Sequence, residues 1–323
     1  MFKTRVTEML KIKYPILGGT MMWLSVPKFV AAVSNAGALG ILASATYRSK
    51  EEFQDAVKET KSLTDKPFAI NLNMFPALRP IPNDVYIDVL LEEGVKIIET
   101  SGHRAPDDML GRLKDAGVTC MHKCVGVRYA RKAESIGVDI VTVVGWENGG
   151  ATGVLDIATL PLVPRVVDNV KIPVIAGGGI GDGRGMVAVL SLGAEGVIIG
   201  TRLLVTEECP MHINVKKALV EAMETDTMLS LRTIGNTHRV WKNAMAERVA
   251  EEEAKGTGLE GLMPLIKGEN NKRMFDDGDL DVGTLACGQA VGLASKIQPV
   301  AEAITEIVEQ AEQAKKRLST LIQ

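Results

Sequence analysis

The chain has 323 residues, of which 46% are hydrophobic and 24% charged, with a formal net charge of −3. This length fits one large domain or two smaller ones, and the nearly balanced charge gives no reason to expect nucleic acid as a partner. No apolar run reaches the roughly 18 residues of a membrane span, and residues 1–13 lack the unbroken apolar core of a signal peptide. We therefore expect a cytoplasmic protein with a small-molecule substrate.

The four cysteines are scattered along the chain. Cys120 and Cys124 have no matching second pair, so the spacing does not indicate a zinc site. The expectation is four reduced thiols and no bound metal.

Eight short apolar runs, each bounded by turn residues, predict buried parallel strands. They are residues 15–19, 40–45, 68–74, 96–102, 119–125, 139–146, 173–179 and 196–201. Amphipathic stretches with helical spacing separate most of them: 26–35, 50–62, 84–93, 106–116, 127–136 and 184–192. Four of these end at a glycine, as helices commonly do. The alternation predicts an α/β fold of the (β/α)8 TIM barrel type. An open doubly wound sheet is the alternative, but Gly18-Gly19-Thr20 is not its glycine fingerprint.

The pattern changes after residue 201. Residues 209–285 are predicted to form a helical insertion after strand eight, with helices at 212–225, 236–255 and 261–267. Residues 300–321 keep helical apolar spacing and are predicted to return to the barrel wall. The predicted domains are thus a barrel of residues 1–208 and 286–323, and an insertion of residues 209–285.

Glycines end the last two predicted strands. Gly177, Gly178 and Gly179 end the seventh strand, and Gly200 precedes Thr201 at the end of the eighth. Glycines let backbone N–H groups approach an anion closely, and a β/α barrel builds its phosphate site after these two strands. One such turn could be a plain strand-to-helix connection, whereas two in register favour a phosphate-bearing ligand.

The other strand ends supply further candidates, because the active site of this fold lies at the C-terminal ends of its strands. They are Gly18, Gly19, Thr20 and Met21 after strand one, Asn71 in strand three, His103 after strand four, His122 and Lys123 in strand five, and Glu147, Gly149 and Gly150 after strand six. Asn71 could instead bond a neighbouring backbone, and either histidine could be a satisfied core residue. Lys123 needs an anionic partner, either a ligand or a carboxylate. A Schiff-base aldolase on the same barrel would use Lys123 as its lysine.

The order and spacing of these motifs resemble a known family. The matching segments are residues 15–23, 33–40, 68–72, 122–124, 145–150, 177–185, 200–201, 232–237 and 288–292. The chain resembles the flavin-dependent barrel enzymes that include nitronate monooxygenases (2-nitropropane dioxygenases), a class of NADH:quinone reductases and the flavin-type enoyl-acyl-carrier-protein reductases. The resemblance implies FMN as cofactor and an insertion that covers the flavin mouth.

The resemblance also implies individual roles. The backbone from Gly19 to Met21 faces the isoalloxazine ring, and Asn71 and Lys123 contact the ring or the ribityl chain. Gly149 and Gly150 line the ring edge. Gly179, Gly200 and Thr201 hold the phosphate.

The chain departs from the family pattern in the loop after strand six. The family usually has a histidine two residues after the position of Gly149, whereas this chain has Ala151, which has no proton to exchange. Thr20 is a second departure, at a position where the family usually has glycine or proline. His103, Glu147 and Thr152 are the candidates for a replacement proton donor.

Three functions remain open from the sequence. The first is an FMN-dependent oxidoreductase that passes hydride from NADH or NADPH to a quinone or an activated alkene, because hydride transfer needs positioning more than a protein base. The second is a nitronate monooxygenase that uses O2. The third is a non-catalytic protein that binds flavin or another phosphate ligand. A homodimer is one assembly that the sequence allows.

Overall fold

A computed structural model of the chain describes residues 2–74, 81–102 and 104–322. Eight parallel strands form one sheet in the order β1-β9-β8-β6-β5-β4-β3-β2. The strands are β1 (Ile16–Gly18), β2 (Gly40–Ala43), β3 (Phe68–Asn73), β4 (Ile97–Ser101), β5 (Thr119–Cys124), β6 (Ile140–Val144), β8 (Val174–Gly177) and β9 (Gly196–Ile199). A parallel bridge between Leu17 and Leu39 joins β1 to the start of β2, and the Gly18 N–H donates to the Leu39 carbonyl at 2.9 Å. The sheet therefore closes, which confirms the predicted (β/α)8 barrel.

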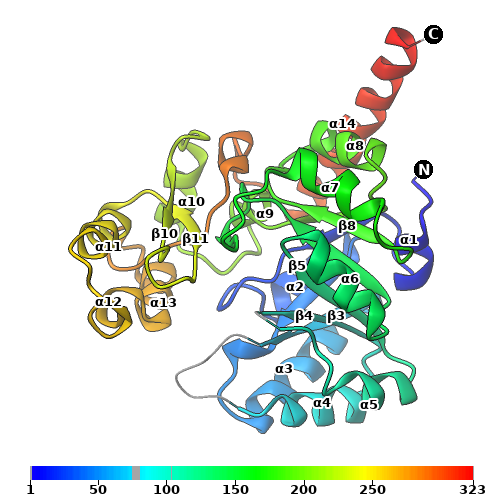
Figure 1. Cartoon of the computed structure of the whole chain (residues 1–323), viewed down its shortest axis with the longest axis horizontal. Helices are drawn as coiled ribbons and strands as arrows, with labels where there is room; N and C mark the ends of the chain where they lie inside the picture. Colours follow the sequence, from blue (N-terminus) through cyan, green and yellow to red (C-terminus); the bar gives the residue numbers. More distant parts are fainter. Residues whose placement is uncertain (1, 75–80, 103, 323) are drawn as a thin grey trace.

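Helices surround this barrel (Figure 1). They are α2 (Pro27–Asn35), α3 (Lys50–Leu63), α4 (Asn83–Glu92), α5 (Leu110–Asp115), α6 (Val127–Ser135), α7 (Thr159–Val167), α8 (Gly183–Ser191) and α14 (Val300–Leu321). Helix α14 packs against α8 and α2, so it occupies the place of the helix that follows the last strand. Its C-terminal end projects from the body of the molecule.

The sequence analysis missed helices α1 and α7 of the barrel, and α9 and α13 of the later segment. Helix α7 contains Pro164, and Pro161 also lies within its bounds, so its sequence does not have a helical composition. Helix α1 (Arg5–Leu10) is short, and its Val6 and Leu10 are buried in the same apolar cluster as the barrel interior. It therefore closes one end of the barrel.

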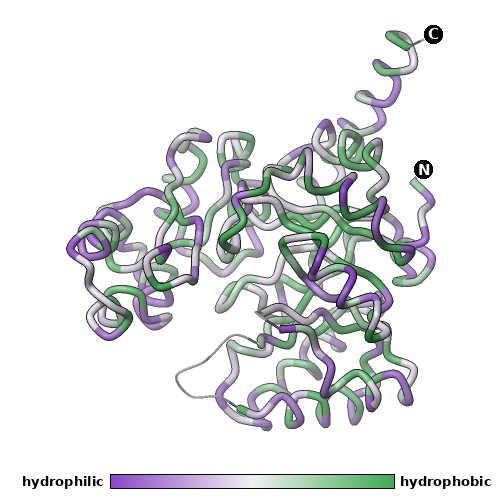
Figure 2. The backbone as a smooth tube through the Cα atoms, in the orientation of Figure 1, coloured by the Kyte–Doolittle hydropathy of each residue, from purple (hydrophilic) through white to green (hydrophobic). Residues whose placement is uncertain are grey.

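The interior and exterior of the barrel have separate cores. The inner cluster includes Leu17, Ile41, Ala69, Ile97, Met121, Ile140, Ile175 and Ile198. A larger cluster fills the layer between the strands and the helices. Because successive side chains of a strand point to opposite faces, strands buried on both faces read as unbroken apolar runs. Figure 2 shows mostly green tube in the middle of the barrel and a mixture of green and purple along the surrounding helices.

The segment between β9 and α14 contains α9 (Thr201–Leu204), α10 (Ile213–Val220), α11 (Ala244–Ala254), α12 (Leu259–Ile266), α13 (Gly268–Asp277) and the strands β10 (Thr227–Ser230) and β11 (His238–Trp241). These strands pair antiparallel, and β11 also pairs with β7 (Gly150–Ala151), which follows β6. The prediction of one helix over 236–255 was therefore wrong for its first part. The helical prediction for 212–225 was also too long, because α10 ends at Val220. β11 ends in Val240 and Trp241, residue types that favour strands, and its pairing with β10 and β7 outweighed the helical pattern.

Most of this segment lies beside the barrel rather than around it (Figure 1). In the part of the chain that the structure describes, none of the helices combines the length and apolar composition that crossing a membrane requires.

Candidate active site

A cavity of about 330 Å³ lies at the C-terminal ends of the barrel strands. Most of the predicted cofactor-binding residues line it: Gly19, Thr20, Met21, Asn71, Lys123, Gly149, Gly150, Gly178, Gly179, Gly200 and Thr201. Gly18 and Gly177 do not. A Cβ on Gly18 would lie 3.3 Å from Val33 of α2, and one on Gly177 would lie 2.5 Å from Ile198, so both positions are too closely packed for a side chain. A cofactor contact of either backbone stays a prediction.

A buried carboxylate that the sequence analysis missed lies beneath the floor of the cavity, where it bonds three lining residues. Glu99 of β4 is fully buried, and its Oε2 accepts hydrogen bonds from the Thr20 hydroxyl at 2.9 Å and from Asn71 Nδ2 at 2.8 Å. Lys123 Nζ donates to the same oxygen at 3.2 Å. The anionic partner of Lys123 is therefore a protein carboxylate, and the Thr20 hydroxyl bonds that carboxylate.

Strand register explains this convergence. Asn71 lies opposite Glu99 in the β3–β4 pair, and Glu99 lies opposite Met121 in the β4–β5 pair. Lys123 is two residues beyond Met121, so it faces the same side of the sheet as Glu99. The sequence signal was a charged residue in an otherwise uncharged strand, because burying a carboxylate is costly unless it is paired.

A second carboxylate, on the side wall of the cavity, has a different role. Glu147, a predicted catalytic residue, lines the cavity, but its carboxylate accepts from the Thr159 backbone N–H at 3.1 Å and from the Thr159 hydroxyl at 3.0 Å. Thr159 is the first residue of α7, so Glu147 satisfies a free N–H group at the helix start. In this structure Glu147 therefore holds the helix.

The other two predicted catalytic residues are Thr152 and His103. Thr152 is 3% exposed, and its hydroxyl lies 3.3 Å from the Gly153 carbonyl and 3.5 Å from that of Thr237, so it is directed to backbone groups. His103 lies outside the described residues. Ala151, at the position of the family histidine, lines the cavity with only a methyl group.

Backbone N–H groups make one end of the cavity suitable for an anion. Gly178 and Gly179 follow β8 with φ values of 93° and 69°, which favour glycine. The N–H groups of Gly179 and Gly200 donate to no other backbone group of the described chain, and both residues line the cavity. The Thr201 hydroxyl accepts from the Gly288 N–H at 2.9 Å. The predicted phosphate position therefore has donors available.

His122 is not part of this cavity. It is 3% exposed, its Nδ1 lies 2.8 Å from the Thr100 hydroxyl, and burial lowers its pKa to about 4. It is therefore neutral near pH 7. All four cysteines are free and buried, and the described residues contain no cluster of three or more His, Cys, Asp or Glu side chains that could hold a metal.

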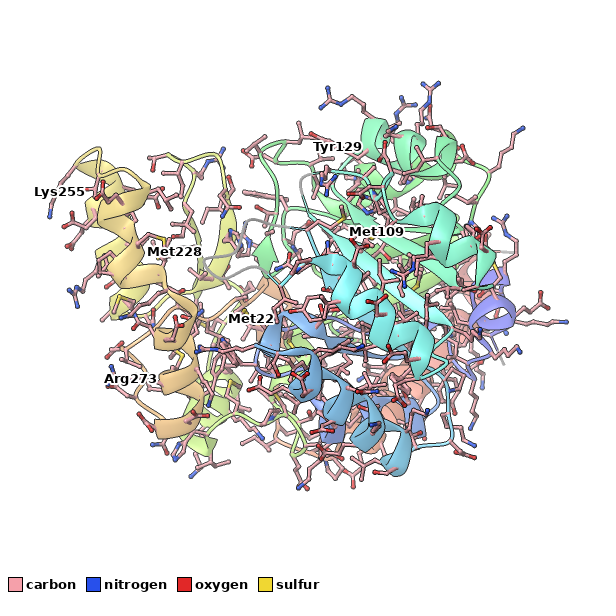
Figure 3. The ribbon with its side chains drawn as sticks, turned by 90° about the horizontal axis from the view of Figure 1, so that it is seen from below. Met22, Met109, Tyr129, Met228, Lys255 and Arg273 are labelled. Atoms are coloured by element: carbon pink, nitrogen blue, oxygen red, sulfur yellow. The ribbon has the colours of Figure 1, made fainter. Side chains whose placement is uncertain are left out.

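The segment after β9 supplies part of the cavity wall through His238, Gly268, Asn271 and Phe275. The sequence analysis did not identify these residues, because nothing in their local pattern indicates which barrel element they approach. Met22, which also lines the cavity, lies at the boundary between the barrel and this segment (Figure 3).

Comparisons with known proteins agree with this arrangement. The family model for nitronate monooxygenase matches residues 3–310. The chain is 34% identical to (3aS,4S,5R,7aS)-5-hydroxy-7a-methyl-1-oxo-octahydro-1H-indene-4-carboxyl-CoA dehydrogenase of Rhodococcus jostii, over 96% of each chain. It is 32% identical to a Staphylococcus saprophyticus protein named "Probable nitronate monooxygenase", over 77% of this chain and 81% of that protein.

Solved structures are also similar. FabK from Thermotoga maritima superposes with a TM-score of 0.90 at 33% identity, covering 100% of both chains. The nitroalkane oxidase of Streptomyces ansochromogenes gives a TM-score of 0.81 at 25% identity, covering 97% of this chain and 99% of the other. These relatives support an enzyme over a non-catalytic binding protein, and the chain belongs to the nitronate monooxygenase family of oxidoreductases.

Proposed function

We propose that this protein is an FMN-dependent reductase that takes hydride from NADH or NADPH and delivers it to an activated alkene or a quinone. The observation that carries the proposal is the contrast within one cavity. The cavity has a fixed cation and free N–H donors, the position beside Gly150 carries the methyl group of Ala151, and the carboxylate of Glu147 is engaged by Thr159.

The residues present fit FMN. The free N–H groups of Gly179 and Gly200 would hold the phosphate, at the place where β/α barrels bind phosphate. Gly149 packs so closely that a Cβ would lie 2.7 Å from the Gly288 nitrogen, which keeps the wall free of side chains where the ring edge is expected. Gly19 and Met21 would face the ring from β1.

The Glu99 network fixes the polar groups on the floor. Lys123 and Asn71 both donate to Glu99, so the ammonium and the amide have set positions before any ligand binds. A preorganised donor stabilises developing negative charge without the cost of reorganisation. Lys123 would serve this role at the polar end of the ring.

When bound, FMN supplies the hydride chemistry, so the protein mainly has to position the reactants and exclude water. This requirement is met without a histidine at position 151. An alkene acceptor also needs a proton, and of the three predicted donors the carboxylate of Glu147 and the hydroxyl of Thr152 are engaged. His103 remains the candidate, and a loss of less than about tenfold in His103→Ala would contradict that role.

Anaerobic mixing of the purified protein with NADH and then with NADPH tests the proposal through the flavin absorbance band. Rapid bleaching by one nucleotide is expected, followed by reoxidation on adding an enone, an enoyl thioester or a quinone. Flavin that stays oxidised with both nucleotides would contradict the reductase proposal. Protein that cannot be loaded with FMN would contradict the cofactor assignment.

The family match favours nitronate oxidation as a second candidate. A nitronate is already an anion, and the ammonium of Lys123 offers it a cation at the cavity wall. Rapid oxygen uptake with propionate 3-nitronate, in air and without NAD(P)H, would favour this activity over the reductase.

A further inference from the structure

A second cavity of about 180 Å³ lies next to the first, and the proposed reaction leaves it without a role. Its wall comes from the segments that follow β4, β5 and β6 and from residues 235–237 of the segment after β9. Four residues line both cavities: Ser101, Lys123, Val144 and Ala151. The two spaces are therefore neighbours that meet at this shared wall.

The second cavity has an apolar part, and its lining also includes Arg104, Lys123 and Lys132. Val125, Tyr129, Val154 and Leu155 contribute to the apolar part, and Val154 and Leu155 are 57% and 46% exposed, which is high for branched apolar side chains. Burying such surface is favourable, so an apolar ligand group would gain free energy here. Tyr129, labelled in Figure 3, comes from α6.

One polar atom of this cavity needs a partner. Thr237 lines the cavity and is 2% exposed, yet its hydroxyl has no hydrogen-bond partner among the described residues. A buried hydroxyl without a partner is unfavourable, and it would donate to an oxygen of a bound molecule. His122 also lines the cavity and is neutral near pH 7, so it adds no charge.

Ala151 makes the connection between the cavities distinctive. At a position where the family that the chain resembles usually has a histidine, this chain has Ala151, whose methyl group lies on the shared wall. The smaller side chain leaves more space between the place expected for the flavin and the second cavity.

We propose that the second cavity binds the apolar part of the substrate, a short hydrocarbon group that carries one hydrogen-bond-accepting oxygen. The electron-poor double bond then lies at the shared wall beside Lys123 and Ala151, and the hydrocarbon group extends toward Leu155 and Thr237. The position of the double bond rests on the proposed reductase function, whereas binding of the hydrocarbon group does not.

The test is equilibrium binding of saturated acyl thioesters of N-acetylcysteamine to the FMN-loaded protein, measured by titration calorimetry. Saturated thioesters cannot accept hydride, so binding is measured whether or not the protein is a reductase. Affinity should rise about fourfold for each added methylene between acetyl and hexanoyl, as burial of a CH₂ predicts.

Leu155→Trp should remove this rise, because the larger ring fills the cavity. Leu160→Trp is the matched control, since Leu160 is 67% exposed on α7 and lines neither cavity. Val154→Trp, at a more exposed position of the same cavity, is a second route to the same result if Leu155→Trp does not fold. Thr237→Val should abolish the preference for 5-oxohexanoyl over hexanoyl thioester.

A wild-type affinity that does not depend on acyl length would overturn the proposal. So would a length dependence that persists in both tryptophan variants. If the wild type shows the length dependence but reduces no enoyl thioester, the binding site stands and the reductase function fails. If the wild type reduces enoyl thioesters but its affinity does not depend on acyl length, the reductase function stands and the binding site fails.

Discussion

The floor and the side wall of the cavity both carry a glutamate, and the two carboxylates differ in what they hold. Glu99, beneath the floor, fixes three side chains that line the cavity: Thr20, Asn71 and Lys123. Glu147, on the side wall, fixes the start of a helix. Glu99 therefore sets the positions of side chains that line the cavity, whereas Glu147 stabilises the fold. The two carboxylates consequently predict different effects when each is replaced.

The largest expected effect is at the floor. Glu99→Ala leaves Lys123 without its carboxylate in a largely buried position, and breaking a buried ion pair costs about 3–5 kcal/mol. Urea denaturation of the apoprotein should show this loss in the free energy of unfolding.

Glu269→Gln provides the control for that experiment. Glu269 pairs with Arg48 at 3.2 Å, but both side chains are 55% exposed, so we expect a loss of no more than about 1 kcal/mol. Equal losses in the two variants would mean that the floor network does not contribute more than a surface pair.

The second largest effect is expected at the buried His122 of β5, which is neutral in the folded protein. His122 has a pKa lowered from 6.5 to about 4 by burial, so between these values the unfolded chain binds a proton that the folded chain does not. The contribution of His122 to the free energy of unfolding should therefore be complete above pH 6.5. It should fall as the pH drops toward 4, by up to about 3 kcal/mol. Unfolding free energies of the wild type and His122→Gln over this range measure the difference. Parallel curves would show that His122 is not the group responsible.

Gly200→Ala probes the anion end of the cavity with little effect on the fold. No atom lies within 4 Å of a Cβ at this position, and its φ of −104° suits alanine, so the apoprotein should keep its melting temperature. The new methyl group would meet the phosphate, and FMN affinity should fall by more than about tenfold, or about 1.4 kcal/mol. Gly111→Ala, which also has open space but lies in α5, is the control and should leave FMN affinity unchanged. Unaltered FMN binding in Gly200→Ala would place the phosphate elsewhere.

The smallest effect is expected at the side wall. Glu147→Gln weakens the bonds to Thr159, and loss of a helix cap costs about 1 kcal/mol. If Glu147 only holds the helix, the turnover number should fall less than tenfold, whereas loss of a general acid costs about 10²–10⁴-fold. A loss in the latter range, with normal stability, would show that Glu147 transfers the proton after all.

Local sequence patterns predicted much of the fold. Unbroken apolar runs located all eight barrel strands, and helical periodicity located most of the surrounding helices. These signals are strong because a strand buried on both faces and a helix buried on one face each require a particular pattern. The pattern failed for α7, where prolines obscure it, and for β11, where pairing with two other strands outweighed the helical prediction.

The site was predicted where glycine and position in the fold were enough, and missed where packing decided. Gly178, Gly179 and Gly200 after β8 and β9 line the cavity, and their contact with an anion stays a prediction. Glu99 was missed because its importance comes from Asn71 and Lys123 on two neighbouring strands and from Thr20 just after β1, which meet only in the closed barrel. Glu147 was recognised as a cavity residue, but only the structure showed that its carboxylate is engaged.

The sequence by itself determined the barrel, because the apolar runs of its strands lie in neighbouring residues. It also predicted which end of the barrel carries the site and the departure at Ala151 from the family pattern that the chain resembles. Only the tertiary structure decided which charges pair and which hydroxyls lack a partner, and it alone placed a second cavity beside the first. Those properties depend on side chains that are far apart in the chain and meet only when the barrel closes.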